Sequence, residues 1–257
     1  MSGTGSAVAM LNGVDFPVEE TMKFYDNWGQ PGTDVHYAVG WSWAMDTPFQ
    51  WMKQVASHFG GTRNPMVVSW PKQIKDKGGL REQFHHVNDI APTLLEVIGI
   101  EQPEYVNGIK QRPMEGVSFA YTFADDGAEA EGRKKTQYFE LMGNRGVYHD
   151  GWMASAFHKE PWNTAGTKDF ALDKWQLYDL SKDYSQADDL AADNPEKLKQ
   201  LQAIFDQEAK KYNVYPLDDR AAARFANPDG INRPSFVTGR KHFEFYPGAV
   251  RLPEAVA

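Results

Sequence analysis

One lysine, Lys53, stands in surroundings that suit an anion-binding side chain. It closes the stretch "TPFQWMK" and precedes the Gly-Gly pair at 60–61. Apolar residues such as Trp51 and Met52 flank it, and glycines let backbone approach a neighbouring group closely. An ammonium between apolar side chains is a strong point charge for an anionic oxygen. Most lysines are solvated surface residues, so this context alone favours the ordinary interpretation.

Two histidines bracket Lys53 along the chain. His36 lies in "DVHYAVGW" and His58 in "SHFGG". Either could add a second contact to an anion, although a single histidine is more often a core or loop residue. We take Lys53 as the candidate anion contact and His36 as the weaker substrate-binding candidate.

Possible metal ligands are few. His85, His86 and Asp89 come nearest, but a metal on a helix needs ligands at i and i+3 or i+4, and Asp89 suits a helix cap better. Asp26 and Asn27 offer the hard oxygens that Ca²⁺ takes, yet the Trp-Gly that follows favours a capping role. We therefore predict no metal site in this chain.

Several classes of protein are disfavoured by composition. The 257 residues include no cysteine, which excludes disulfides, thiolate metal sites and Cys nucleophiles. Neither a GxSxG nor a Walker motif is present. The net charge of -8 argues against nucleic-acid binding, and no apolar run is long enough to span a membrane. The residues alone therefore indicate an anion-attracting lysine without specifying a reaction.

The elements that must position these residues fall into two groups. "NPMVVSWP" (64–71) predicts a buried strand of a parallel sheet. "NDIAPTLLEVIGI" (88–100) predicts a helix that Asp89 caps, with Pro92 in its first turn and Gly99 at its end.

Further along, short aromatic segments predict an antiparallel meander, namely "TQYFEL", "RGVYHDGWMAS" and "WQLYDL". Residues 194–214 predict an amphipathic helix that starts at Asn194 and buries Leu201 and Phe205. A weak strand signal lies at 241–248.

We predict an α/β fold in which an α/β domain is followed by a smaller antiparallel sheet with a packed helix. The predicted parts are a domain over 1–124, a charged seam over 125–135, the antiparallel subdomain over 136–214 and an extended tail over 215–257.

In order, six blocks resemble the C-terminal part of arylsulfatases, in the alkaline phosphatase-like superfamily. The resemblance covers roughly residues 8–220. The six blocks are "HYAVGWSWAMDTPFQWMK", "GGTRNPMVVSWP", "FHHVNDIAPTLLEVIGI", "VNGIKQRPMEGVSFAYTF", "TQYFELMGNRGVYHDGWMAS" and "WQLYDLSKDYSQADDLAADNPEKLKQLQAIFDQEAKKYNVYPLDD". The α/β domain we predict is accordingly the C-terminal share of an alkaline phosphatase-like domain.

The resemblance implies hydrolysis of a small sulfate ester to an alcohol or phenol and sulfate. It also implies a formylglycine nucleophile made from the Cys or Ser of a C/S-x-P-x-R motif, and a Ca²⁺ held by Asp and Asn side chains. A lysine in the block matching "TPFQWMK" contacts the sulfate in such enzymes, and here that lysine is Lys53.

This sequence departs from that pattern. It has no cysteine, no Ser-x-Pro-x-Arg and no N-terminal Asp pair, and Asp26–Asn27 does not occupy the family's Asp-Asn position. We therefore expect a fragment that retains neither formylglycine nor calcium ligands and is inactive alone.

Two alternatives remain open. The chain could be a non-catalytic binding or assembly module that complements a separate N-terminal half. It could also belong to a phosphoester or phosphonate hydrolase of the same superfamily.

Overall fold

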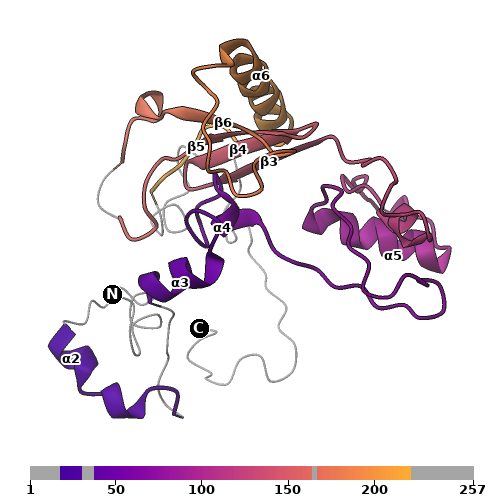
Figure 1. The fold of residues 1–257 in the computed structure, drawn as a ribbon, viewed down its shortest axis with the longest axis horizontal. Coiled ribbons are helices and arrows are strands. Elements are labelled where there is room, and N and C mark those ends of the chain that lie inside the picture. Colours follow the sequence, from indigo (N-terminus) through magenta and orange to yellow (C-terminus); the bar gives the residue numbers. More distant parts are fainter. Residues whose placement is uncertain (1–17, 31–37, 164–166, 221–257) are drawn as a thin grey trace.

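A computed structural model of the chain describes residues 18–30, 38–163 and 167–220. A four-stranded sheet carries the long helix α6, and α5 and α2 lie on opposite sides of this assembly in Figure 1. The helices are α2 (Val18–Met22), α3 (Val39–Asp46), α4 (Phe59–Thr62), α5 (Ile90–Ile98) and α6 (Pro195–Lys211), with single 3₁₀ turns η1 (Tyr25–Asn27), η2 (Val87–Asp89), η3 (Ala120–Phe123) and η4 (Phe170–Leu172). The strands are β1 (Tyr105–Val106), β2 (Ile109–Lys110), β3 (Thr136–Leu141), β4 (Asn144–His149), β5 (Trp152–Ala156) and β6 (Trp175–Asp179).

The predicted meander is confirmed. The four strands follow one another in the order β3-β4-β5-β6, and every neighbouring pair is antiparallel. Their register aligns one row across the sheet, from Tyr138 through Val147 and Ala154 to Leu177. This row supplies the apolar face that the helix covers.

Two-residue turns join the first three strands. Met142–Gly143 and Asp150–Gly151 both have positive φ at each central position (53° and 85°, then 48° and 85°). Positive φ at both positions defines the type I′ turn, whose twist matches that of a hairpin. Glycine at the second position of each turn therefore fixes the strand register.

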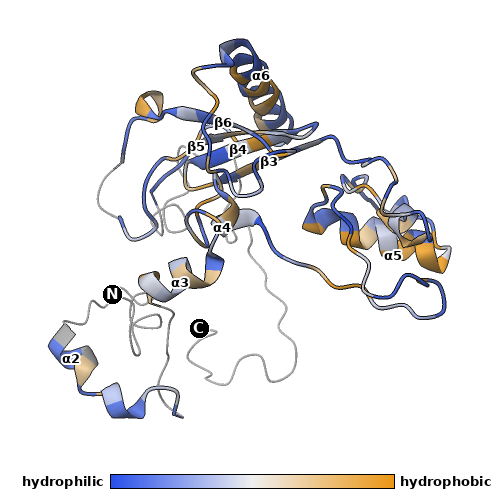
Figure 2. Ribbon diagram, in the orientation of Figure 1, coloured by the Kyte–Doolittle hydropathy of each residue, from blue (hydrophilic) through white to orange (hydrophobic). Residues whose placement is uncertain are grey.

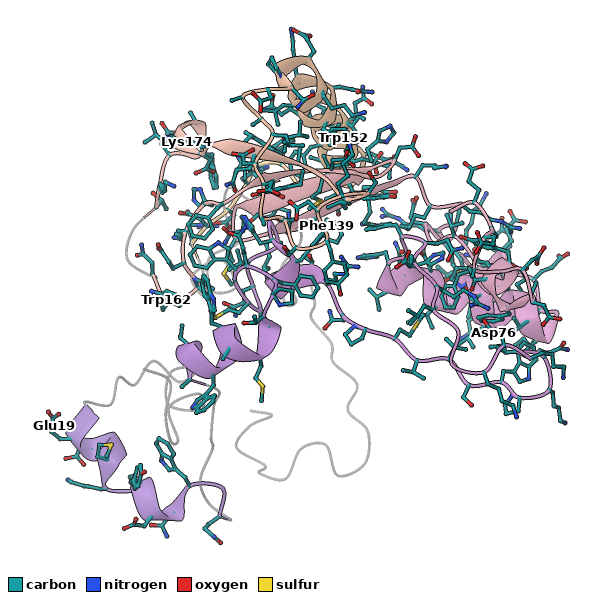
Figure 3. All side chains as sticks on the ribbon, in the orientation of Figure 1. Glu19, Asp76, Phe139, Trp152, Trp162 and Lys174 are labelled. Atoms are coloured by element: carbon teal, nitrogen blue, oxygen red, sulfur yellow. The ribbon has the colours of Figure 1, made fainter. Side chains whose placement is uncertain are left out.

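Helix α6 packs on the sheet as its amphipathic pattern predicts. Leu201, Phe205 and Ala209 are buried on one face against the row that contains Val147 and Leu177. Figure 3 shows side chains filling the space between α6 and the sheet. Full burial of a side chain such as Phe205 contributes about 1.5–3 kcal/mol to stability.

Helix α5 begins differently from the prediction. Its C-terminal end is confirmed, since Gly99 has φ 72° and donates its N–H to the carbonyls of Glu96 and Leu95. Asp89 precedes the helix but its carboxylate caps none of the α5 amides. That carboxylate instead accepts a hydrogen bond from the N–H of His86, in a capping box around η2. The reason is that Asp89 is the last residue of this 3₁₀ turn, so its side chain folds back onto the start of the turn.

The predicted strand at 64–71 is wrong for the described structure. Residues 63–70 pair with no other described segment, and Val67 has 94% of its surface exposed. A strand requires backbone partners, and an apolar run does not supply them by itself. In Figure 2 part of this run is coloured orange, and α5 carries both hydrophobic and hydrophilic residues.

The fold class is confirmed as mixed helix and sheet, with a small antiparallel sheet and a packed helix. Within the described residues, no helix is both long and apolar enough to cross a bilayer. The strand signal at 241–248 lies outside the described residues.

Candidate anion-binding site

Lys53 lies in the loop between α3 and α4, at the exposed side of a tight turn. The residues on either side of this turn are buried, Met52 at 5% exposure and Val55 at 0%. The Val55 N–H donates to the Met52 carbonyl over 3.1 Å and closes the turn. The Lys53 side chain therefore extends into solvent from a backbone that is fixed on both sides.

Aromatic stacking holds the start of this loop. Trp51 stacks on Phe157, which follows β5, with ring centres 4.2 Å apart, and meets Trp43 of α3 edge-on at 5.3 Å. Such ring pairs contribute about 0.5–1.5 kcal/mol beyond their burial. The loop is thus joined to both α3 and the sheet.

The glycine pair allows the close approach that the sequence predicts. A Cβ on Gly60 would lie 2.1 Å from the Trp51 carbonyl oxygen, and one on Gly61 would lie 2.1 Å from that of Val55. The group that approaches is the loop's own backbone. Gly60 and Gly61 therefore allow α4 to pack closely against the backbone of the Lys53 loop.

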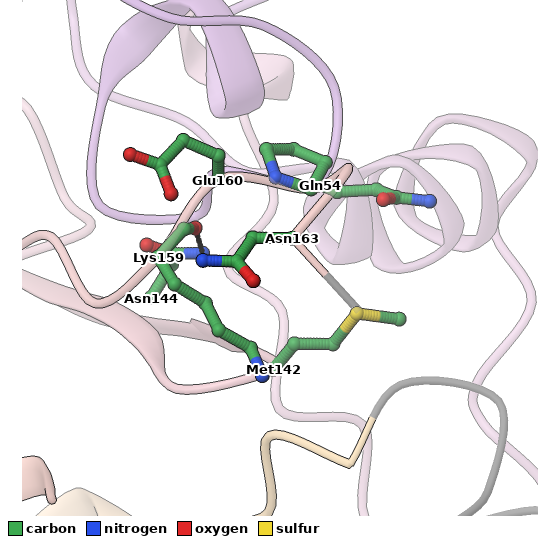
Figure 4. A pocket seen from close by; sticks show the side chains of 7 residues that line it. Gln54, Met142, Asn144, Lys159, Glu160 and Asn163 are labelled. Atoms are coloured by element: carbon green, nitrogen blue, oxygen red, sulfur yellow. Dashed lines mark hydrogen bonds between the residues drawn. The ribbon is translucent and has the colours of Figure 1, made fainter. Parts of the chain in front are cut away.

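A small hollow lies beside the loop that carries Lys53, and Gln54 of that loop lines it (Figure 4). Gln54 lines it together with side chains from the β3–β4 turn and from the segment after β5, namely Met142, Asn144, Lys159, Glu160 and Asn163. Its volume of about 10 Å³ holds about one water molecule. The hollow forms where the loop that carries Gln54 meets the β3–β4 turn and the segment after β5.

A buried ionic network supports this hollow. The ring of His158 is wholly buried and lies between two carboxylates, with Nδ1 2.8 Å from Asp173 Oδ2 and Nε2 3.2 Å from Asp219 Oδ2. Arg145 pairs with Asp173 over 2.7 Å, and Lys159 with Asp219 over 2.9 Å. The network joins the β3–β4 hairpin, the segment after β5 and the residues after α6.

The cations keep both carboxyl groups ionised. Burial by itself would raise the pKa of Asp173, but hydrogen bonds from Arg145, His158 and Lys168 outweigh it and lower that pKa. The pKa of Asp219 is also lowered, because hydrogen bonds from Lys159, the Lys168 backbone and His158 outweigh its burial.

The two candidate histidines do not join Lys53 in the described structure. His36 lies outside the described residues. His58 is 1% exposed, and burial lowers its pKa to about 4, although a hydrogen bond to Gln176 acts in the opposite direction. Its Nδ1 lies 2.8 Å from the Ser57 hydroxyl. His58 is therefore a neutral interior residue at neutral pH.

The other residues considered as metal ligands have structural contacts. Asp89 is buried against Lys134 at 2.9 Å, and His85 Nδ1 lies 3.4 Å from its other oxygen. Asp26 and Asn27 lie in η1. Across residues 18–30, 38–163 and 167–220, no three His, Asp or Glu side chains gather in a way that could hold a metal ion.

Sequence reasoning missed the ionic network. His158 lies 15 positions from Asp173 and 61 positions from Asp219. Neither spacing corresponds to the period of a helix or a strand. Only the tertiary contacts bring them together, so a single sequence carries no local signal for this cluster.

Comparison with known proteins adds a family. Residues 49–214, more than half of the chain, match the family described as N-sulphoglucosamine sulphohydrolase, C-terminal. An uncharacterized sulfatase of Schizosaccharomyces pombe is 27% identical over 209 residues, which cover 78% of this chain and 35% of that protein. An N-acetylglucosamine-6-O-sulfatase of Bacteroides thetaiotaomicron is 23% identical over 63% of this chain and 28% of its own length. The arylsulfatase of Klebsiella aerogenes is 31% identical over 37% of this chain and 20% of its own length.

Among solved structures, the protein named Ps i-CgsB is 19% identical, with a TM-score of 0.46 over 68% of this chain and 34% of its own. The chain spans about a third or less of the length of the curated relatives it matches. The matched region begins just before Lys53 and ends just after α6.

Proposed function

Because this chain belongs to the family of N-sulphoglucosamine sulphohydrolase C-terminal domains, we propose that it forms the sulfate-holding C-terminal part of a sulfuric ester hydrolase. Lys53 is the residue that contacts the sulfate group of a small sulfate ester. The observation that carries the proposal is the placement of Lys53, whose side chain is exposed while its neighbours Met52 and Val55 are buried. A fixed backbone with a free ammonium suits a group that must meet a ligand in one place.

The role of Lys53 in this proposal is electrostatic. Its ammonium acts as a positive point charge beside the sulfate oxygens, both when the ester binds and as negative charge shifts to the leaving oxygen. One ammonium near the surface contributes about 1–4 kcal/mol to such a contact. That free energy corresponds to dissociation constants of about 1 mM or weaker. Sulfate binding by this chain alone is therefore weak, and the rest of the affinity comes from other groups.

Formylglycine and Ca²⁺, which the family resemblance implies, do not fit the residues of this chain. The sequence has no cysteine, and the described part of the chain offers no cluster of three His, Asp or Glu. We derive no catalytic step through either group, and we propose that the chain by itself does not turn over sulfate esters.

Titration with inorganic sulfate tests the role of Lys53. At constant ionic strength, ¹H–¹⁵N spectra of the full chain should show saturable shifts in the amides of the loop around Lys53. Lys53→Ala should abolish these shifts, while Lys77→Ala, which removes an exposed lysine from another loop, should leave them unchanged. Equal shifts in Lys53→Ala would refute the proposal. Inorganic phosphate in a parallel titration tests the phosphoester alternative, which predicts tighter binding of phosphate than of sulfate.

A second proposal, an assembly role, is favoured by the exposed apolar surface. Val67 is 94% exposed and Met66 52%, and Leu94 and Ile98 of α5 are 56% and 61% exposed. A run that is apolar on both faces suits a strand inside a buried sheet, and no described segment pairs with this run. We therefore take the partner to be a polypeptide that supplies strands, such as a separate N-terminal half.

Co-expression with the polypeptide encoded directly upstream tests this second proposal. Val67→Glu should abolish co-purification, because it places a charge on the surface that would pair. Leu172→Glu is the matched control, since Leu172 is 69% exposed on η4, away from the apolar run. Equal recovery with both variants would exclude this surface as the assembly site.

A further inference from the structure

Gln186 lies on the loop between β6 and α6 and is completely buried. Its side chain reaches the Lys53 loop, which is far away in sequence. The Phe59 N–H donates to Gln186 Oε1 over 2.7 Å. The Nε2 group donates to the Ser155 hydroxyl over 3.1 Å and to the Ser57 carbonyl over 3.4 Å. One amide therefore bonds both the loop and the central strand β5.

The backbone of Gln186 bonds the other end of the same loop. Its carbonyl oxygen accepts a hydrogen bond from Gln50 Nε2. Gln50 precedes Lys53 by three positions, while Ser57 and Phe59 follow it by four and six. Gln186 thus forms hydrogen bonds on both sides of Lys53 along the chain.

An amide is well matched to these partners. Gln186 offers one acceptor oxygen and two donor hydrogens, and Phe59, Ser57 and Ser155 use all three. A glutamate would keep the acceptor for Phe59 but would direct a carboxylate oxygen at the Ser57 carbonyl. The Phe59 N–H belongs to the first turn of α4 and has no partner within that helix.

The path of the loop is tightly packed and strained, so it depends on contacts with the rest of the chain. Gly60 and Gly61 pack against the carbonyls of Trp51 and Val55, and Trp51 and Gln54 hold positive φ values of 65° and 81°. Positive φ in a non-glycine residue costs free energy that surrounding contacts must offset. The Gln186 bonds are among the contacts that offset it.

We propose that Gln186 is a positioning residue for the sulfate contact, because it fixes both ends of the Lys53 loop to the antiparallel sheet. The inference rests on the proposed function of Lys53. It concerns a residue that does not itself meet the sulfate, and it makes the β6–α6 loop part of the machinery that sets sulfate affinity.

Two measurements on the full chain test this proposal. The first is hydrogen exchange of the Phe59 amide, and the second is the sulfate titration described above. Gln186→Ala should raise the exchange rate at Phe59 about fivefold or more, because the buried Phe59 N–H would lose its acceptor. It should also weaken sulfate binding at Lys53 about three- to tenfold.

Gln83→Ala provides the matched control. Gln83 is another glutamine that bridges a loop, since its Nε2 donates to the carbonyls of Gly127, Ala128 and Ala130, away from Lys53. It should change neither measurement. Gln50→Ala is the milder second variant if Gln186→Ala does not fold, and it should produce both effects at a smaller size.

The outcomes separate the two proposals. If sulfate shifts survive in Lys53→Ala, the proposed function fails, and the exchange rate at Phe59 still decides whether Gln186 holds the loop. If Phe59 exchange or sulfate affinity is unchanged in a folded Gln186→Ala or Gln50→Ala chain, the positioning role is overturned. An equal loss of affinity in Gln83→Ala would likewise overturn it, because general destabilisation would then explain the effect.

Discussion

Replacing Asp89 by Asn should strongly destabilise the region that contains α5. The Asp89 carboxylate is fully buried and accepts hydrogen bonds from three groups. Oδ1 accepts from Lys134 Nζ at 2.9 Å and from the Val117 N–H at 2.8 Å. Oδ2 accepts from the His86 N–H at 2.8 Å. This side chain therefore joins η2, the segment before η3 and the start of the sheet.

The size of the effect follows from Lys134, which is only 5% exposed. In Asp89→Asn its ammonium would be left with neutral acceptors, such as Asn88 Oδ1 at 3.1 Å, and no carboxylate. Removing one partner of a buried ion pair costs about 3–5 kcal/mol. Lys134→Met should cost less, about 1–3 kcal/mol, because two backbone N–H groups still bind the carboxylate. The double variant should lose less than the sum of the two.

Urea unfolding at pH 7, followed by fluorescence and circular dichroism, would measure these differences. The four proteins form a double-mutant cycle whose coupling energy reports the pair. A loss below about 1 kcal/mol in Asp89→Asn, or simple additivity in the double variant, would refute the reasoning. Either result would mean that the carboxylate and ammonium are not coupled in the folded chain.

The same pair predicts how acid affects stability. Burial tends to raise the pKa of Asp89, but hydrogen bonds from His85, Lys134 and two backbone amides leave it well below 3.8. A folded pKa below the unfolded value means that the contribution is complete above the unfolded pKa and is lost as pH falls toward the folded one. Wild-type stability should therefore fall below about pH 4 more steeply than that of Asp89→Asn.

Three further predictions concern the rest of the chain. Asp173→Asn should destabilise the fold by about 3–5 kcal/mol at pH 7, because Arg145 and His158 would lose their shared buried carboxylate. Urea unfolding measures this loss, and a free energy of unfolding equal to that of the wild type would refute the prediction. Gly61→Ala should cost about 1–3 kcal/mol, since its Cβ would lie 2.1 Å from the Val55 carbonyl, whereas Gly40→Ala, with open space around it in α3, should not lower the midpoint of thermal unfolding. The pure chain should release no phenol from an aryl sulfate, and turnover that copurifies with the chain and disappears in Lys53→Ala would contradict this.

The antiparallel sheet and α6 could be predicted from the sequence because their patterns are local and their partners are close by. Short aromatic segments separated by glycine-containing turns predict hairpins, and Leu201 and Phe205 mark the buried face of α6. Each signal lies within the element that it describes. The packing partner of each element follows within a few tens of residues.

The run at 64–71 shows where such reasoning stops. Its composition predicts burial, but burial depends on neighbours that the described chain does not provide, so Val67 lies exposed. Within the candidate site too, some residues could be identified from the sequence and others could not. Lys53 is identified by its resemblance to a family block and stays a prediction as a sulfate contact. His158 and Gln186 act through contacts between distant segments, which no single stretch of sequence encodes.

The nearest-neighbour order of the sheet has a consequence for folding kinetics. Strands β3 to β6 each pair with the strands next to them in sequence, and short loop closures of this kind are fast. The bonds from Gln186 to the Lys53 loop join residues 127 to 136 positions apart, which closes a much longer loop. We therefore expect the sheet and α6 to form early and the lysine-bearing loop to dock late. The rate of that last step sets how soon after synthesis the chain can bind an anion.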